Sequence, residues 1–116
     1  MSQIEEIMQK CAELGKSIAN TKIYKDFKQA EYDLLHNPEA RKLMEDLQKL
    51  QQDQYRRKIA GIELTNEEKD KIKEMENLCL KDSQIFASNN ANTKFQEFME
   101  QISKKIREGI KSIEGQ

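Results

Sequence analysis

The sequence lacks valine and tryptophan, and it has one proline, one histidine, two cysteines and four glycines among 116 residues. Threonine, which with valine favours strands, is scarce, whereas Glu, Lys, Gln, Leu and Met, which favour helices, are plentiful. This composition predicts an all-α protein.

An excess of charge of one sign and long apolar runs are also missing. The 20 Lys and Arg residues face 21 Asp and Glu residues, so no overall field draws the chain to nucleic acid, an anionic membrane or an acidic substrate. No apolar run approaches the roughly 18 residues of a membrane span. The acidic start at Glu5 and Glu6 lacks the basic and then apolar pattern of a signal peptide. We therefore expect a soluble, cytoplasmic protein without a membrane partner.

Few residues could carry catalysis or bind a metal. Cys11 and Cys79 are far apart in the sequence and form no CxxC pair, which argues against a zinc site or a disulfide framework and favours buried, reduced core cysteines. His36 is the only histidine, which excludes a di-iron site of the helical-bundle type. Its place at the end of a predicted helix favours a bond to the last carbonyls.

No Ser-His-Asp arrangement, glycine-rich phosphate loop or dinucleotide fingerprint occurs in the sequence. We therefore expect no catalytic residue, no cofactor and no metal. A metal or redox sensor that uses Cys11, Cys79 or His36 is the alternative that we rank last.

Apolar residues recur at spacings of three and four along most of the chain, which predicts amphipathic helices. Ser2 with Glu5 and Thr65 with Glu68 form capping boxes, and Asn37-Pro38 is a strong helix start. The predicted helices are residues 3–19, about 22–35, 38 to near Gly61, 66 to the polar cluster Ser88-Asn89-Asn90, and about Ala91 onward.

The segment from Gly61 to Leu64 reads as a short turn between two long antiparallel helices. Such a turn would place Leu47 opposite Cys79, and Tyr55 opposite Ile72. We expect residues 1–116 to form a single helical domain, an elongated antiparallel bundle of about five helices with a long central helical hairpin.

The last predicted helix has an apolar stripe that needs a partner along its whole length. Because small chains bury only a limited fraction of their surface, this stripe predicts an oligomer seam, with dimerisation as its simplest form. The residues of this candidate seam are Phe95, Phe98, Met99, Ile102, Ile106, Ile110 and Ile113.

Two basic clusters remain, one near the hairpin turn and one on the last helix. Interleaved Glu and Gln residues make both typical of solvated faces, and Glu100 and Glu108 interrupt the second, so direct nucleic-acid binding is not expected. The turn cluster is the better candidate for docking a partner protein, because Tyr and Arg are enriched at interfaces. Its residues are Tyr55, Arg56 and Arg57, although Tyr55 has the alternative of packing on Ile72.

Several residues occur in an order that resembles the YlbF/YmcA family of small helical bacterial proteins. They are the run Leu14-Gly15-Lys16-Ser17-Ile18-Ala19-Asn20-Thr21, then Tyr24, Phe27 and Ala30, then Asn37-Pro38-Glu39-Ala40, Leu43 and Gln51-Gln52. The turn Ala60-Gly61-Ile62-Glu63-Leu64-Thr65-Asn66-Glu67-Glu68 is most similar to the YheA-like branch of that family. The sequence departs from the family pattern at Leu47, where an aromatic residue is expected.

The resemblance implies an all-helical protein, commonly an oligomer. It also implies a cytoplasmic regulator of competence, biofilm formation or sporulation, within a multiprotein complex that assists an RNA-processing endonuclease. Some family complexes bind iron–sulfur clusters through cysteines near the C-terminus, but residues 112–116 here include no cysteine, so no cluster is expected.

The leading hypothesis is a non-enzymatic adaptor or regulatory protein that acts through protein–protein contacts. Its expected partners are a second copy, as a homodimer, or helical paralogues, as a hetero-oligomer, with an endonuclease complex as a further candidate. The alternative is an accessory factor of RNA processing that touches RNA through Arg56, Arg57, Lys58 and the lysines of the last helix, with binding that weakens steeply with salt.

Overall fold

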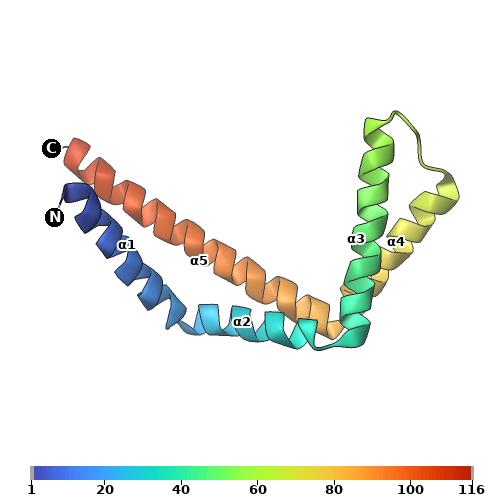
Figure 1. Cartoon of the computed structure of the whole chain (residues 1–116), viewed down its shortest axis with the longest axis horizontal. Coiled ribbons are helices and arrows are strands. Elements are labelled where there is room, and N and C mark those ends of the chain that lie inside the picture. Colours follow the sequence, from blue (N-terminus) through green and yellow to red (C-terminus); the bar gives the residue numbers. More distant parts are fainter. Residues whose placement is uncertain (1, 116) are drawn as a thin grey trace. The chain divides into compact units, whose positions relative to one another are not determined.

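The computed structural model describes residues 2–115, and within that range the chain has five helices and no strand. This confirms the all-α prediction, and the bounds of the first two helices agree with those predicted. The helices are α1 (Gln3–Ala19), α2 (Lys22–Leu35), α3 (Pro38–Ile59), α4 (Asn66–Lys81) and α5 (Ser83–Glu114) (Figure 1).

The helix starts use the caps that the sequence indicates. The Ser2 hydroxyl accepts from the Glu5 backbone N–H at 3.1 Å, and the Asn37 side chain accepts from Ala40 N–H at the same distance. Thr65 and Glu68 form a complete capping box at the start of α4. Side-chain oxygens at these positions satisfy N–H groups that have no partner within the helix, so each cap determines where its helix begins.

The boundary between the fourth and fifth helices was predicted wrongly. The chain breaks at Asp82, where the backbone is extended, and Asn89 and Asn90 lie inside α5. The Asp82 carboxylate accepts from the backbone N–H groups of Gln84 and Ile85, both at 2.9 Å. A carboxylate that caps two N–H groups defines a helix start, whereas asparagines within a continuing apolar pattern reduce helix propensity only slightly.

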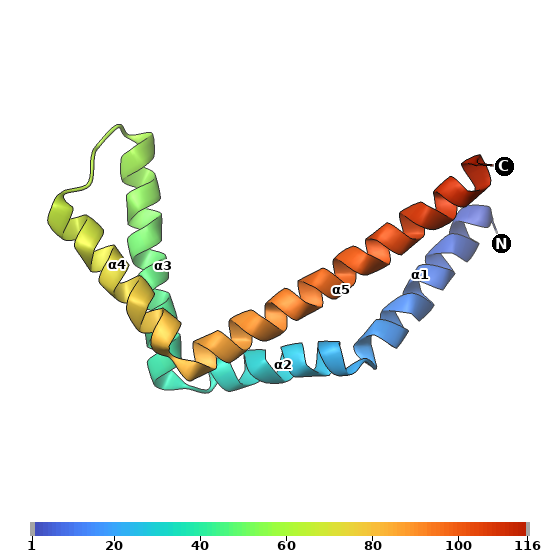
Figure 2. The same cartoon turned by 180° about the vertical axis from the view of Figure 1, so that it is seen from behind.

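Two compact units make up the chain, and each is described by itself. Unit 1 comprises residues up to 29 and from 90 onward, and unit 2 comprises residues 30–89. In unit 1, α1 lies beside the C-terminal part of α5 and runs antiparallel to it (Figures 1 and 2). The start of α2 joins them after a corner where the Thr21 hydroxyl accepts from Tyr24 N–H at 3.2 Å.

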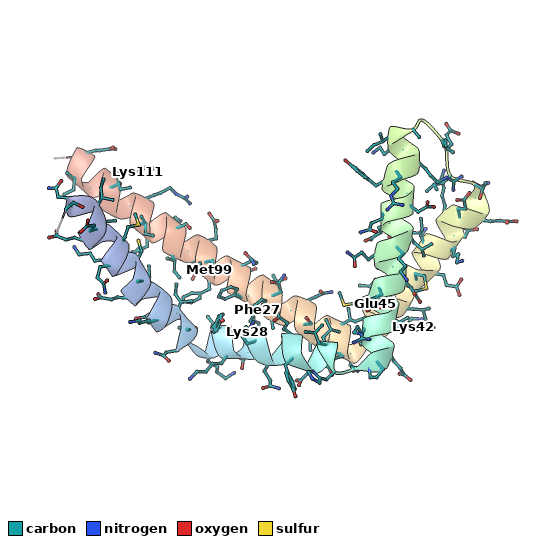
Figure 3. All side chains as sticks on the ribbon, viewed as in Figure 1. Phe27, Lys28, Lys42, Glu45, Met99 and Lys111 are labelled. Carbon is teal, nitrogen blue, oxygen red and sulfur yellow. The ribbon has the colours of Figure 1, made fainter. Side chains whose placement is uncertain are left out.

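Three aromatic rings hold α2 against α5 in unit 1. The ring of Phe95 stacks on that of Phe27, with 4.9 Å between centroids, and meets the ring of Tyr24 edge-on at 5.6 Å. Figure 3 shows Phe27 directed from α2 toward α5. All three residues are half-buried, in a unit that has no buried side chain among its described residues.

Unit 2 is built on the hairpin of α3 and α4, which confirms the predicted central hairpin. The two helices pack at their base and diverge toward the turn (Figures 1 and 2). In this turn Gly61 has a φ of 73°, a conformation that favours glycine. At the base the Cys79 thiol lies 3.7 Å from the Leu43 carbonyl oxygen and can donate to it.

The core of unit 2 is small. Ala40, Cys79 and Ile85 are buried together, and Leu34, Leu43 and Leu47 pack against them half-buried. The predicted juxtaposition of Leu47 with Cys79 is therefore confirmed. Ile72 is also buried, at 8% exposure, but Tyr55, expected opposite it, remains 66% exposed.

The capping role of Asp82 leads to a test with a matched control. We expect Asp82→Ala to lower the free energy of unfolding by about 0.5–2 kcal/mol, because two helix N–H groups lose their acceptor. Asn90→Ala, in the segment where the sequence predicted a turn, is expected to be neutral or slightly stabilising, because alanine is the better helix former. Urea unfolding followed by circular dichroism measures both. A larger loss for Asn90→Ala than for Asp82→Ala would contradict this helix boundary.

Candidate protein-interaction surfaces

Of the residues that could carry chemistry, His36 has a structural partner within α2. No group of three or more His, Cys, Asp or Glu among the described residues is placed to hold a metal ion. Nδ1 of His36 lies 2.8 Å from the Tyr32 carbonyl oxygen, and the two rings stack with 3.9 Å between centroids. His36 therefore binds a carbonyl of the last turn of α2, as predicted.

The predicted seam on the last helix, here the α5 stripe, divides into two parts. Phe95, Phe98, Met99 and Ile102 are half-buried, whereas Ile106, Ile110 and Ile113 are 53%, 56% and 70% exposed. The first part begins at Phe95, whose ring contacts those of Tyr24 and Phe27 on α2. The second part lies on the C-terminal part of α5, where α1 runs beside it and the three isoleucines stay exposed (Figures 1 and 2).

A second apolar stripe, on α1, was not singled out as a site from the sequence. Its residues are Ile4, Ile7, Met8, Cys11, Leu14 and Ile18, of which only Ile18 is half-buried and the others are exposed. The interpretation of Cys11 as a buried core cysteine is therefore wrong, because the face of α1 that holds it is exposed in the described part of the chain. The signal was present in the sequence, since the apolar residues of this helix recur at spacings of three and four.

The solvent-exposed area of the chain shows how much more surface is open than in a compact protein of the same mass. The chain exposes 9621 Å². A compact monomer of this mass exposes about 6,600 Å², and two separate compact units of half that mass together expose about 7,900 Å². The excess is thus at least about 1,700 Å², which exceeds the roughly 800 Å² that one partner buries in a standard interface.

Unit 2 has an apolar groove beside its small core. It has a volume of about 570 Å³, and its floor includes Leu34, Leu47, Cys79 and Ile85. Leu35 and Met44 line it while 55% and 39% exposed. Its polar lining residues are Arg41, Glu45, Gln48, Gln51 and Asn89.

A smaller hollow of about 290 Å³ lies on another side of the same core. It shares Leu47, Cys79, Ile85 and Asn89 with the groove and adds the exposed apolar side chains of Leu80 and Phe86. The core of unit 2 is therefore open on two sides, and its apolar surface continues outward rather than ending at a polar shell.

The candidate docking residues near the hairpin turn have different surroundings. Tyr55 is 66% exposed and, with Arg56, lines a polar hollow beside Gln48, Gln51 and Gln52. Arg57 is instead half-buried and forms an ion pair with Glu68 across the hairpin. The interpretation of Arg57 as a solvated surface residue is therefore wrong, because its guanidinium joins α3 to the capping box of α4.

The basic cluster on the last helix is compensated in part within that helix. Arg107 pairs with Glu100 at 3.1 Å, and Lys105 pairs with Glu108 at 3.3 Å. Figure 3 shows Lys111 on the side of α5 that is turned away from α1. These residues do not form the contiguous, uncompensated basic patch that nucleic-acid binding requires.

Cys79 is a buried thiol in an environment that opposes ionisation. Burial raises the pKa of Cys79, and the nearby Asp82 carboxylate raises it further. The thiolate is the reactive form of cysteine, so both effects make this residue unreactive at neutral pH. The raised pKa fits a core role and disfavours a redox role.

A model of the family described as control of competence regulator ComK, YlbF/YmcA, matches residues 7–111. The chain belongs to the YlbF/YmcA family. The match includes most of α1, all of α2, α3 and α4, and most of α5, so the groove and all of both apolar stripes except Ile4 and Ile113 lie within it. No curated protein matches the chain. Within residues 2–115, no helix of this YlbF/YmcA protein has both the length and the apolarity needed to cross a membrane.

The ion pair at the hairpin turn predicts a difference between two adjacent arginines. Arg57→Ala is expected to lower the free energy of unfolding of this YlbF/YmcA protein by about 1 kcal/mol, because a half-buried pair between two helices is lost. Arg56→Ala removes an exposed side chain and is expected to change it by no more than about 0.5 kcal/mol. Urea unfolding measures both, and equal values would show that the pair contributes nothing.

The environment of Cys79 predicts slow native-state labelling. In a Cys11→Ser variant, we expect a thiol reagent to modify Cys79 much more slowly in buffer than in urea. Because the folded chain holds the thiol proton more tightly than the unfolded chain, this group favours folding below its ordinary pKa. That contribution is lost as the pH rises through the raised value. Labelling rates measured from about pH 7 to 9 check both effects, and equal rates with and without urea would contradict the burial of Cys79.

Proposed function

We propose that this YlbF/YmcA protein is a non-enzymatic cytoplasmic adaptor that acts in the control of the competence regulator by binding other helical proteins. The observation that carries the proposal is the excess exposed surface of at least about 1,700 Å², together with the large apolar side chains that are exposed in both units. Soluble monomers rarely leave large apolar patches open, and such patches mark interaction sites.

The groove of unit 2 is the site that we assign to a regulatory partner. An amphipathic helix places apolar residues in such a groove at spacings of three and four. The Arg41–Glu45 ion pair of 3.4 Å compensates the charges at the rim, and Gln48, Gln51 and Asn89 offer amide groups. The groove therefore suits a helix whose buried face is apolar and whose flanks are polar but uncharged.

The finer assignments rest on the family resemblance. The turn from Ala60 to Glu68 supports membership of the YheA-like branch. We propose helical paralogues as the first candidates for the partner, and a complex around an RNA-processing endonuclease as the larger assembly. Direct RNA contact by Arg56, Arg57 and Lys58 is disfavoured, because Arg57 is already paired with Glu68.

The groove assignment is tested by three tagged variants in the native cell. Leu35→Lys places a charge in the groove, Leu78→Lys places the same charge on an exposed position of α4 outside it, and Tyr55→Ala alters the hairpin-turn candidate. We expect Leu35→Lys to lose the captured helical partner and to fail to restore competence-regulator activity in a deletion strain. Leu78→Lys and Tyr55→Ala should behave as the unmodified protein.

Capture is measured by mass spectrometry at two salt concentrations, with and without nuclease, and circular dichroism checks that each variant is folded. If folded Leu35→Lys restored activity fully, the groove would not be the regulatory site. If Tyr55→Ala alone failed, that site would be at the hairpin turn. Partners lost on nuclease treatment or at the higher salt would favour the RNA-associated alternative.

A further inference from the structure

The hairpin of unit 2 has a further hollow beside its turn, which we call the turn hollow. It has a volume of about 410 Å³. Because α3 and α4 diverge toward this end of the hairpin (Figures 1 and 2), side chains from both helices and from the turn line it. Its lining residues are Gln54 and Lys58 of α3, Lys69 of α4, and Gly61, Ile62, Glu63 and Leu64 of the turn. None of them lines the groove of unit 2, so the turn hollow is a separate site.

Two lysines, one from each helix, line the turn hollow. Lys58 and Lys69 are exposed, and neither ammonium group has an ion pair or hydrogen bond with a described residue. The residues just before them, Arg57 and Glu68, form an ion pair across the hairpin. Two like charges that line one hollow repel each other, whereas opposite charges would attract. Departures from local charge matching are expected at functional sites, so the lysine pair indicates that the turn hollow receives an anionic group.

The other lining residues restrict the kind of anion. Ile62, which is 52% exposed, and Leu64, which is half-buried, provide apolar surface, and Gln54 adds an amide group. Glu63 also lines the hollow, but the two lysines outweigh its carboxylate, so a negative ligand is still favoured. Nucleic acid has a negative charge at every nucleotide and no aliphatic side chain for the apolar surface. A protein segment with both acidic and apolar residues offers a group for each part of the lining.

We propose that the turn hollow binds a short acidic segment of a partner protein that also has a large apolar residue. Carboxylates of the segment pair with Lys58 and Lys69 and so replace their mutual repulsion by attraction to a shared partner. The apolar side chain of the segment covers Ile62 and Leu64. This inference goes beyond the proposed function, because it gives unit 2 a second docking site that is independent of the groove.

A peptide titration followed by nuclear magnetic resonance tests the proposal. The probe is a short blocked peptide of glutamate and leucine, added to the isotope-labelled full chain, and its control has glutamine in place of each glutamate. We expect the glutamate peptide to shift the backbone amide signals of Lys58, Lys69 and residues 61–64, and the glutamine peptide to leave them nearly unchanged. The dissociation constant of the glutamate peptide should rise with added salt, because salt screens exposed charges.

Matched substitutions assign the binding to the two lysines. Lys58→Gln together with Lys69→Gln should raise the dissociation constant by about tenfold. Lys71→Gln removes the same charge from an exposed position of α4 outside the hollow and should leave it nearly unchanged. Glu63→Gln should lower it, because a competing carboxylate is removed. In the free protein, Lys69→Gln should keep or raise the urea midpoint of unfolding, since it removes a charge that repels Lys58 and lies near the positive end of α4.

Equal binding of the two peptides would overturn the proposal, as would a glutamate peptide that shifts no signal at the turn. A loss of affinity in Lys71→Gln as large as that of the double variant would show that only general charge is sensed. An unchanged or weaker affinity in Glu63→Gln would count against the proposal independently of the lysines. An RNA oligonucleotide that shifts these signals when the peptide does not would assign the turn hollow to nucleic acid instead.

The proposed function is tested separately from the turn hollow. Leu35→Lys should leave the peptide titration unchanged, and the double lysine variant should still capture the helical partner through the groove. If the peptide binds but folded Leu35→Lys restores regulation, the groove assignment fails and the turn hollow stands. If the peptide does not bind but Leu35→Lys loses its partner, the groove stands and the turn hollow fails.

Discussion

A helix with an apolar stripe needs neighbours on both flanks of that stripe, and unit 1 has too few helices to provide them. In this unit only α1 and the first part of α2 lie beside α5. The rings of Tyr24 and Phe27 contact Phe95 and so cover one end of the α5 stripe. Beyond Ile102 the stripe has α1 on one side and solvent on the other. The open apolar stripes of α1 and α5 and the exposure of Cys11 both follow from this shortage of covering helices.

Unit 2 meets the same constraint in a different way. Its hairpin packs at the base around Ala40, Cys79 and Ile85, and then the helices diverge toward a turn that the pair of Arg57 and Glu68 bridges. This core is too small to be enclosed, and its residues Leu47, Cys79 and Ile85 line both the groove and the smaller hollow. The open edges of this core are the features that suit unit 2 to receive a partner helix, as the proposed adaptor role requires.

Local interactions account for the parts of the fold that were predictable. Ser2, Asn37 and Thr65 act within three residues of themselves, so their caps and the starts of α1, α3 and α4 could be recognised from short segments. The error at Asp82 also has a local cause. Aspartate and asparagine both favour caps, so Asp82 and the cluster at Asn89 and Asn90 are both candidate helix starts. The packing of Ile85 into the core of unit 2 distinguishes them, because Ile85 lies in the first turn of the helix that Asp82 caps.

The candidate site was predictable in outline and not in extent. The α5 stripe was evident from its period, but the sequence could not show that Phe95, Phe98, Met99 and Ile102 are half-buried while Ile106, Ile110 and Ile113 are exposed, because that depends on how the other helices pack along α5. Arg57 and Arg56 look alike in the sequence. Only the distance across the hairpin distinguishes the paired residue from the exposed one.

The sequence by itself determined the helical class, the number of helices, most of their ends and the family, because propensity, capping and periodicity act over one or two helical turns. The tertiary structure alone decided which apolar residues remain open, which arginine is bound and which cysteine is buried. These properties depend on contacts between residues that are far apart in the chain, such as Cys79 with Leu43 and Arg57 with Glu68. A stripe shows that a helix has a face to bury, and only the packing of the other helices shows how much of that face is left for a partner.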